Sequence, residues 1–220
     1  GPSNHVQPMS ANKHPNLETR WSLVRRLKDL DDHESWTTFY DTYANLIYGF
    51  ALKTGLSHSE AQEALQETVI EVSKRIQRFH AECKAGSFKS WLCKVASWKI
   101  GDQFKKRRRH QRLLDGYEPN GQDIDINPDL IPDPNTSAAL ERLWQTEWET
   151  HLITRSLNAL GNQIPTIHYQ IFLLLTREEL SPTEVSKAMD YPVSRIYVIK
   201  HRVARRFTKL YQSILHQEEN

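Results

Sequence analysis

SPTEVSKAMDYPVSRIYVIKHRV, residues 181–203, reads as two helices joined by a tight turn. Ser181 can cap the first helix, and Glu184 then lies near the positive end of the helix dipole. Pro192 excludes helical geometry from the residue before it, so the first helix must end there. Ser194 can cap the second helix. This order of a capped helix, a short turn and a second helix predicts a helix-turn-helix.

The second of these helices, from Val193 to about Leu215, has two chemically different faces. At about 100° per residue, the apolar residues Ile196, Ile199, Val203, Phe207 and Leu210 fall in one sector. The residues predicted to bind duplex DNA lie opposite and beside them: Ser194, Arg195, Tyr197, Val198, His201, Arg202 and Arg205. Arginines reach guanine acceptors or phosphates in a major groove, and shorter side chains near the start of the helix face base edges. The alternative is a solvated amphipathic helix with a chance basic face.

Upstream, two blocks of opposite charge meet. Residues 105–112 (KKRRRHQR) hold six basic side chains, whereas residues 115–135 contain six acidic residues, four prolines and no Lys or Arg. Proline interrupts helices and like charges repel, so we expect residues 114–136 to form an extended, flexible linker. The linker separates a first domain, 19–113, from a second, 137–216. Residues 1–18 are expected to be a tail that begins with a protease-cleavage scar.

Helical spacing of apolar residues dominates the rest of the chain. Besides the helix-turn-helix, it predicts helices at 36–50, 61–79, 88–109, 137–160 and 167–175. Ser57 or Ser59 can cap the second of these. No segment alternates for long with the period of a strand. We therefore expect an all-α protein made of two small helical domains.

Composition excludes several classes of protein. The chain is 38% hydrophobic and 25% charged, and no apolar run approaches the roughly 18 to 20 residues that span a bilayer. No apolar signal segment appears at the N-terminus, so we expect a cytoplasmic protein with no membrane segment. Cys83 and Cys93 are too few for a disulfide framework, and the ten histidines form no metal-binding signature. We expect no cofactor, no metal and no enzymatic activity.

Two upstream helices also have distinct faces. With Leu65, Val69 and Val72 inward, helix 61–79 turns Glu63, Glu67, Ile70, Glu71 and Lys74 outward. In helix 88–109, Ser90, Lys94, Ser97, Lys105 and Arg108 lie on one flank that can follow a phosphate backbone. Trp98 is either a core residue or an aromatic platform for an unstacked base.

Four further segments carry a family resemblance through their order and spacing. They are TRWSLVRRLKD (19–29), GLSHSEAQEALQETVIEV (55–72), GSFKSWLCKVA (86–96) and HYQIFLLL (168–175). Together with the helix-turn-helix, they resemble bacterial RNA polymerase sigma factors of the extracytoplasmic-function (ECF) group in the sigma-70 family. These minimal factors have only domains two and four, and the resemblance covers residues 19–210.

The resemblance implies a transcription initiation factor that directs core RNA polymerase to particular promoters. The second domain would read the minus-35 element as duplex, and the first would recognise and melt the minus-10 element. Implied partners are promoter DNA, the beta-prime clamp helices and the beta flap of the polymerase, and an anti-sigma factor. A stand-alone helix-turn-helix regulator is the alternative function.

The resemblance also assigns residues. It implies polymerase contacts by Glu63, Gln66, Glu67, Ile70 and Glu71. It implies minus-10 contacts by Lys89, Ser90, Lys94, Ser97, Trp98, Lys99, Lys105, Arg108 and Arg109. An unstacked base would be held by the loop around residues 79–89.

Overall fold

The computed structural model describes residues 20–79, 88–115 and 134–219, and these ranges contain helices but no strand. The helices are α1 (Arg20–Arg26), α2 (His33–Lys53), α3 (His58–Arg75), the short 3₁₀ helix η1 (Ile76–Arg78), α5 (Phe88–Leu114), α6 (Pro134–Gly161), α7 (Thr166–Thr176), α8 (Pro182–Met189) and α9 (Val193–Glu219). The predicted all-α class is confirmed.

Three sequence predictions fall wholly or largely outside the described residues. These are the tail 1–18, most of the loop 79–89 and most of the linker 114–136. At the borders of that linker, α5 still includes Leu114 and α6 already begins at Pro134. Helix α6 therefore begins inside the acidic segment, whereas α5 ends just before its first residue, Asp115.

Helices α3 and α8 begin with the same capping box. The Ser57 hydroxyl accepts a hydrogen bond from the Glu60 amide at 3.3 Å, and the Glu60 carboxylate accepts one from the Ser57 amide at 2.8 Å. Ser181 and Glu184 form the equivalent pair at 3.3 and 2.7 Å. Each box satisfies two backbone amides that the first helical turn leaves unpaired. Ser57 and Ser181 are the caps, as predicted.

The turn of the helix-turn-helix is built around a left-handed residue. Asp190 has φ 48° and ψ 50°, and the Ser186 hydroxyl donates to the Tyr191 carbonyl at 2.7 Å. Asp tolerates this conformation better than most residues because its short side chain bonds locally. The predicted cap at Ser194 is wrong. Ser194 lies inside α9, which begins at Val193. In the first turn of this helix, the Arg195 and Ile196 amides donate to the Pro192 carbonyl at 3.0 and 3.1 Å.

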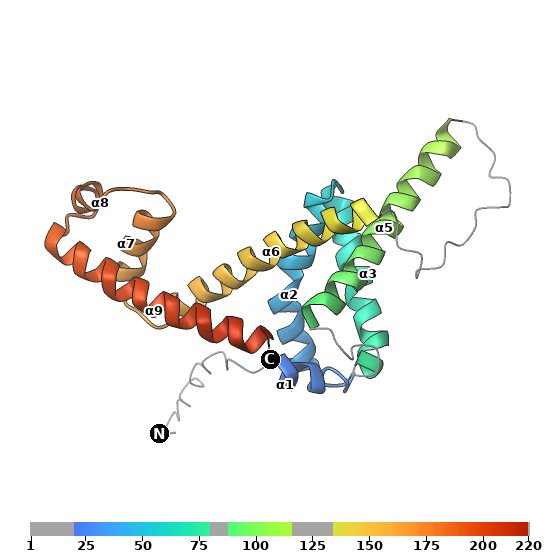
Figure 1. Ribbon diagram of the computed structural model, residues 1–220, viewed down its shortest axis with the longest axis horizontal. Helices are drawn as coiled ribbons and strands as arrows, with labels where there is room; N and C mark the ends of the chain where they lie inside the picture. The colour runs from blue at the N-terminus through green and yellow to red at the C-terminus, as the bar shows by residue number, and fades with distance from the viewer. Residues whose placement is uncertain (1–19, 80–87, 116–133, 220) are drawn as a thin grey trace, which may run out of the picture.

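The apolar side chains form two buried clusters, and α6 and α9 contribute to both. The first cluster holds the buried residues of α1, α2, α3 and α5, together with Trp144, Trp148 and Leu152 of α6 and Ile214 of α9. The second contains buried residues of α7, α8, the end of α6 and the part of α9 up to Leu210. Both long helices thus run between the two groups (Figure 1). The sequence division places α6 and α9 in the second domain alone, and this division into two domains stays a prediction.

The contact of α2 with α6 and α9 is aromatic and partly polar. The Tyr43 ring stacks on Trp148 and on His151, with centroids 6.3 and 5.6 Å apart. The Tyr43 hydroxyl donates to the Glu218 carboxylate at 3.3 Å, and Arg155 forms an ion pair with the same carboxylate. Burial lowers the pKa of His151 to about 3, with a further contribution from Arg155. His151 is therefore a neutral member of this contact near pH 7.

Candidate functional site

All seven residues predicted to meet duplex DNA are exposed on one side of α9. Ile196, Ile199 and Val203 of the opposite face are buried in the second cluster, as predicted. Two large apolar side chains remain on the exposed side, with Tyr197 at 58% and Val198 at 54% exposure. Exposed apolar groups set among arginines are typical of a binding surface, because solvation alone does not favour them.

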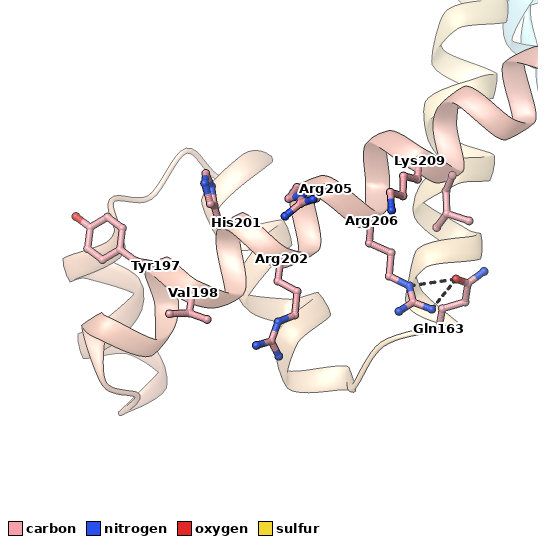
Figure 2. A pocket seen from close by; sticks show the side chains of 9 residues that line it. Gln163, Tyr197, Val198, His201, Arg202, Arg205, Arg206 and Lys209 are labelled. Atoms are coloured by element: carbon pink, nitrogen blue, oxygen red, sulfur yellow. Dashed lines mark hydrogen bonds between the residues drawn. The ribbon is translucent and has the colours of Figure 1, made fainter.

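Five of these seven residues line one shallow groove of about 960 Å³ along α9: Tyr197, Val198, His201, Arg202 and Arg205. Figure 2 shows them projecting from consecutive turns of a single helix. The groove continues past Arg206 and Lys209 to Gln163, whose side-chain oxygen accepts hydrogen bonds from Arg206 at 3.2 and 3.3 Å. No carboxylate lines the groove. An anionic ligand therefore meets only positive or neutral side chains there.

Ser194 and Arg195 border a smaller neighbouring hollow. It shares Val198 and Arg202 with the groove and adds His168 of α7 and Tyr191 of the turn. Sequence reasoning missed His168 and Gln163 because both come from other segments of the fold. Lys209 was also left out, although its basic character and its place on the helix wheel were visible signals, whereas Arg206 was recognised as flanking the DNA-facing side.

The predicted polymerase-facing residues share one side of α3 but differ in exposure. Glu63 and Gln66 are exposed, and Ile70 retains 52% of its surface. Glu67 is half-buried, and the Glu71 side chain is only 14% exposed. The helix wheel places Glu71 outward, but the neighbouring α5 covers that position. An exposed isoleucine flanked by carboxylates is the most distinctive feature of this face.

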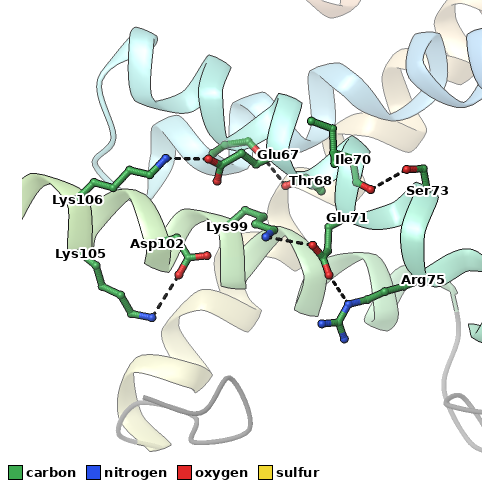
Figure 3. A network of polar contacts seen from close by, with 11 residues as sticks. Glu67, Thr68, Ile70, Glu71, Ser73, Arg75, Lys99, Asp102, Lys105 and Lys106 are labelled. Carbon is green, nitrogen blue, oxygen red and sulfur yellow. Dashed lines mark hydrogen bonds and ion pairs between the residues drawn. The ribbon is translucent and has the colours of Figure 1, made fainter. Parts of the chain in front are cut away.

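A row of ion pairs joins this side of α3 to α5 (Figure 3). The Lys106 ammonium lies 2.6 Å from a Glu63 oxygen and 2.8 Å from a Glu67 oxygen. These contacts lower the pKa of Glu63 and raise that of Lys106. Lys99 and Arg75 contact the Glu71 carboxylate at 3.2 and 2.5 Å. Burial favours a higher pKa for Glu71, but these two hydrogen bonds outweigh it and the pKa is lowered.

Arg107 continues the row at its far end. Its guanidinium donates to the Glu60 carboxylate, with Nε–Oε1 at 2.7 Å, and to the Gly55 carbonyl at 3.2 Å. The hydrogen bond from Arg107, assisted by the Ser57 amide, lowers the pKa of Glu60 to about 2. Glu60 thus takes part both in the capping box of α3 and in the contact between α3 and α5.

The residues predicted to contact the minus-10 element differ in their burial and in their contacts within the chain. Lys89 hydrogen-bonds to Gln145 of α6, and its ammonium lies 5.5 Å from the Trp148 ring centroid. Trp98 is half-buried, with the Arg75 guanidinium 4.7 Å over its ring. Lys99 is held by Glu71, and Ser97 is half-buried beside Cys93. The structure therefore engages these side chains internally.

The other residues predicted to contact the minus-10 element are more exposed to solvent. Ser90 and Lys94 are exposed near the start of α5, and Arg108 and Arg109 are exposed near its end. Lys105 is also exposed and contacts Asp102 of its own helix at 3.2 Å. Lys105 and Arg109 line a hollow with Glu67 and Ile70, so the predicted DNA-binding and polymerase-binding sets meet between α3 and α5.

Other chemistry has little support in the described residues. Within residues 20–79, 88–115 and 134–219, no three or more His, Cys, Asp or Glu side chains are grouped to hold a metal ion. Over the same part of the chain, no helix combines the length and apolarity needed to cross a membrane. Burial raises the pKa of the Cys93 thiol to about 11, so it is protonated and unreactive near pH 7.

Comparison with known proteins agrees with this geometry. Residues 39–110, which include most of α2, all of α3 and most of α5, match the family model described as Sigma-70 region 2. The "ECF RNA polymerase sigma factor RpoE" of Cereibacter sphaeroides is 25% identical over 116 residues, covering 52% of this chain. The match spans 58% of that relative's length.

One solved structure resembles the chain only distantly. "Structure of CnrH in complex with the cytosolic domain of CnrY" aligns with 89% of this chain and 99% of that chain, at 11% identity and a TM-score of 0.35. A likeness this weak carries no argument. The family model and the curated relative confirm the resemblance seen in the sequence: residues 39–110 match Sigma-70 region 2, and the chain is similar to a sigma factor of the ECF group.

Proposed function

We propose that this chain is a transcription initiation factor that binds core RNA polymerase and directs it to specific promoters. The observation that carries the proposal is the presence, in one chain, of a Sigma-70 region 2 and a helix-turn-helix whose exposed groove lacks carboxylates. RNA synthesis would be catalysed by the polymerase, and we assign no enzymatic activity to this chain. Such a factor acts in the cytoplasm, where the promoters are.

In this proposal α9 reads the minus-35 element as duplex. Arg202 borders both hollows of the helix and has an exposed guanidinium, which suits bidentate contact with a guanine. Arg195 precedes Arg202 on the same side of α9, and Arg205 follows it. Both suit phosphate contacts that fix the position of the helix on the duplex. Tyr197 and Val198 offer apolar contact to thymine methyl groups.

The exposed cations of α5 would hold the minus-10 region. Lys94, Arg108 and Arg109 are open to solvent and suit phosphate contacts along a displaced strand. Melting needs no catalytic side chain, because binding of the single strand offsets an unpairing cost of a few kcal/mol per extruded base. Trp98 is covered by Arg75 on one face, so base stacking on that face requires Arg75 to move.

Helix α3 would dock on the clamp helices of the beta-prime subunit. Glu63 and Gln66 offer polar contacts around Ile70, the apolar centre of this face. Exposed charges at the rim of such an interface set orientation and association rate more than affinity. The second domain would meet the beta flap, and an anti-sigma factor is a further partner that the family resemblance suggests.

Purification with core polymerase followed by run-off transcription tests the proposal. A transcript that depends on both the chain and a particular promoter is expected. Duplex binding without polymerase association would instead favour a stand-alone regulator, which usually binds a palindrome as a symmetric dimer. Failure to associate with polymerase, or association without any preference among templates, contradicts the proposed function.

A further inference from the structure

The basic run of α5 is divided between two faces by the helical repeat. Lys106 and Arg107 turn toward α3 and contact its carboxylates. Arg108 and Arg109 are exposed, and neither forms an ion pair within the part of the chain that the structure describes. One continuous block of charge thus has an internal half and a solvent-facing half.

Lys106 occupies carboxylates that the family resemblance assigns to the polymerase, whereas Arg107 contacts Glu60, which lies outside that set. Lys106 bridges Glu63 and Glu67 at 2.6 and 2.8 Å. A cation approaching from the polymerase must compete with the Lys106 ammonium for those oxygens. While Lys106 stays in place, it also repels the incoming cation, and like-charge contacts of this kind oppose binding.

The position of Lys106 also determines what happens when it is displaced. Its ammonium sits on a flexible four-carbon stem, so it can leave the carboxylates without any change in α5. The hollow between α3 and α5 that Lys106 lines also includes Lys105 and Arg109. A released Lys106 therefore joins two cations assigned to DNA and adds one positive charge to that group.

We propose that Lys106 is an internal competitor for the polymerase-facing carboxylates of α3, and that polymerase binding releases it toward DNA. This inference rests on the proposed function and adds regulation to the same surface. Because linkage is reciprocal, DNA phosphates that attract Lys106 also open Glu63 and Glu67 to the polymerase, by the same factor. The pairs are exposed, with 49% of the Lys106 side chain accessible, so the coupling is modest and weakens with salt.

The test compares Lys106→Gln with Lys74→Gln in the full chain. Lys74 is exposed and lines the same hollow, but its ammonium contacts no carboxylate among the described residues. Each variant removes one positive charge, so their difference isolates the contact with Glu63 and Glu67. Affinity for core polymerase from the organism that makes this chain is measured without DNA at low salt. Lys106→Gln is expected to bind about two- to fivefold tighter than Lys74→Gln.

A second arm measures binding of a minus-10 single strand. Lys106→Gln is expected to weaken it when the chain is bound to polymerase and to leave it nearly unchanged in the free chain, where Lys106 is already engaged. Unchanged or weaker polymerase binding by Lys106→Gln, with circular dichroism equal to the wild type, overturns the competitor role. If the wild-type chain itself does not bind polymerase, the proposed function fails, and this inference fails with it.

Discussion

Acidification is expected to weaken the packing of α6 on α2 through His151. The imidazole is only 8% exposed, stacks on Tyr43, makes a tilted contact with Trp148, and has no hydrogen-bond partner at Nε2. Burial lowers its pKa to about 3 in the folded chain, against an ordinary value of 6.5. Between these values the unfolded chain binds a proton that the folded chain excludes. Stability from this group is therefore full above pH 6.5 and falls as the pH drops toward 3.

The size of the effect follows from the shift. Each pH unit below the unfolded pKa lowers the free energy of unfolding by about 1.4 kcal/mol. Lowering the pH from about 7.5 to about 5 therefore lowers that free energy by about 2 kcal/mol. The matched control is His151→Phe, which keeps an aromatic ring beside Tyr43 but cannot titrate. Because the Nε2 atom that is lost has no hydrogen-bond partner, the unfolding free energy of the variant near neutral pH is expected to lie within about 1 kcal/mol of the wild-type value.

Denaturant unfolding of both proteins at the two pH values supplies the measurement. The other histidines titrate equally in wild type and variant, so the difference between their pH dependences reports His151 alone. We expect the wild type to lose about 2 kcal/mol more than His151→Phe. Parallel losses in the two proteins would refute the burial of a neutral imidazole against α2, and with it this part of the account of how α6 joins the first cluster.

Three further predictions concern α3 and the helix-turn-helix. Arg202→Ala is expected to weaken minus-35 duplex binding by about 1 to 3 kcal/mol, measured by fluorescence anisotropy on matched and mismatched duplexes; an equal loss on both would contradict base readout. Glu67→Lys is expected to reduce polymerase association about five- to tenfold while leaving duplex binding intact, and unchanged association would remove Glu67 from the polymerase-facing set. Asp190→Gly is expected to raise the unfolding free energy by about 0.5 to 1 kcal/mol, because glycine adopts the left-handed conformation without a Cβ penalty; a loss of stability would show that the Asp190 side chain supports the turn.

Local chemistry accounts for the features that were predicted correctly. Ser57 and Ser181 cap their helices because each is followed at the third position by a glutamate that completes a capping box. The two faces of α9 follow from helical period alone. Ser194 was assigned as a cap because serine is a common capping residue. In the structure α9 already begins at Val193, two residues before a helix capped by Ser194 would begin, and the Pro192 carbonyl accepts from the Arg195 and Ile196 amides.

Tertiary contacts account for what sequence reasoning could not reach. The apolar stripe of α6 predicts that Trp144 and Trp148 are buried, but periodicity does not say against which helix, and the partner proves to be the first cluster. Glu71 is outward on its own helix and becomes covered only because α5 packs beside it. Lys89, which the family resemblance assigns to minus-10 DNA, is engaged by Gln145, 56 residues away in sequence.

The same distinction applies to the basic run of α5, in which Lys105, Arg108 and Arg109 were all assigned to DNA. Six basic side chains within residues 105–112 cannot all face one direction, because successive residues of a helix are about 100° apart. The predicted phosphate-binding flank included Lys105 and Arg108, whereas Lys106 and Arg107 were given no position and no partner. The carboxylates of α3 supply that partner. A surface that pairs its own opposite charges offers fewer free charges to a ligand than its composition suggests, and this is the physical basis of the coupling proposed between the polymerase-facing and DNA-facing sides of α3 and α5.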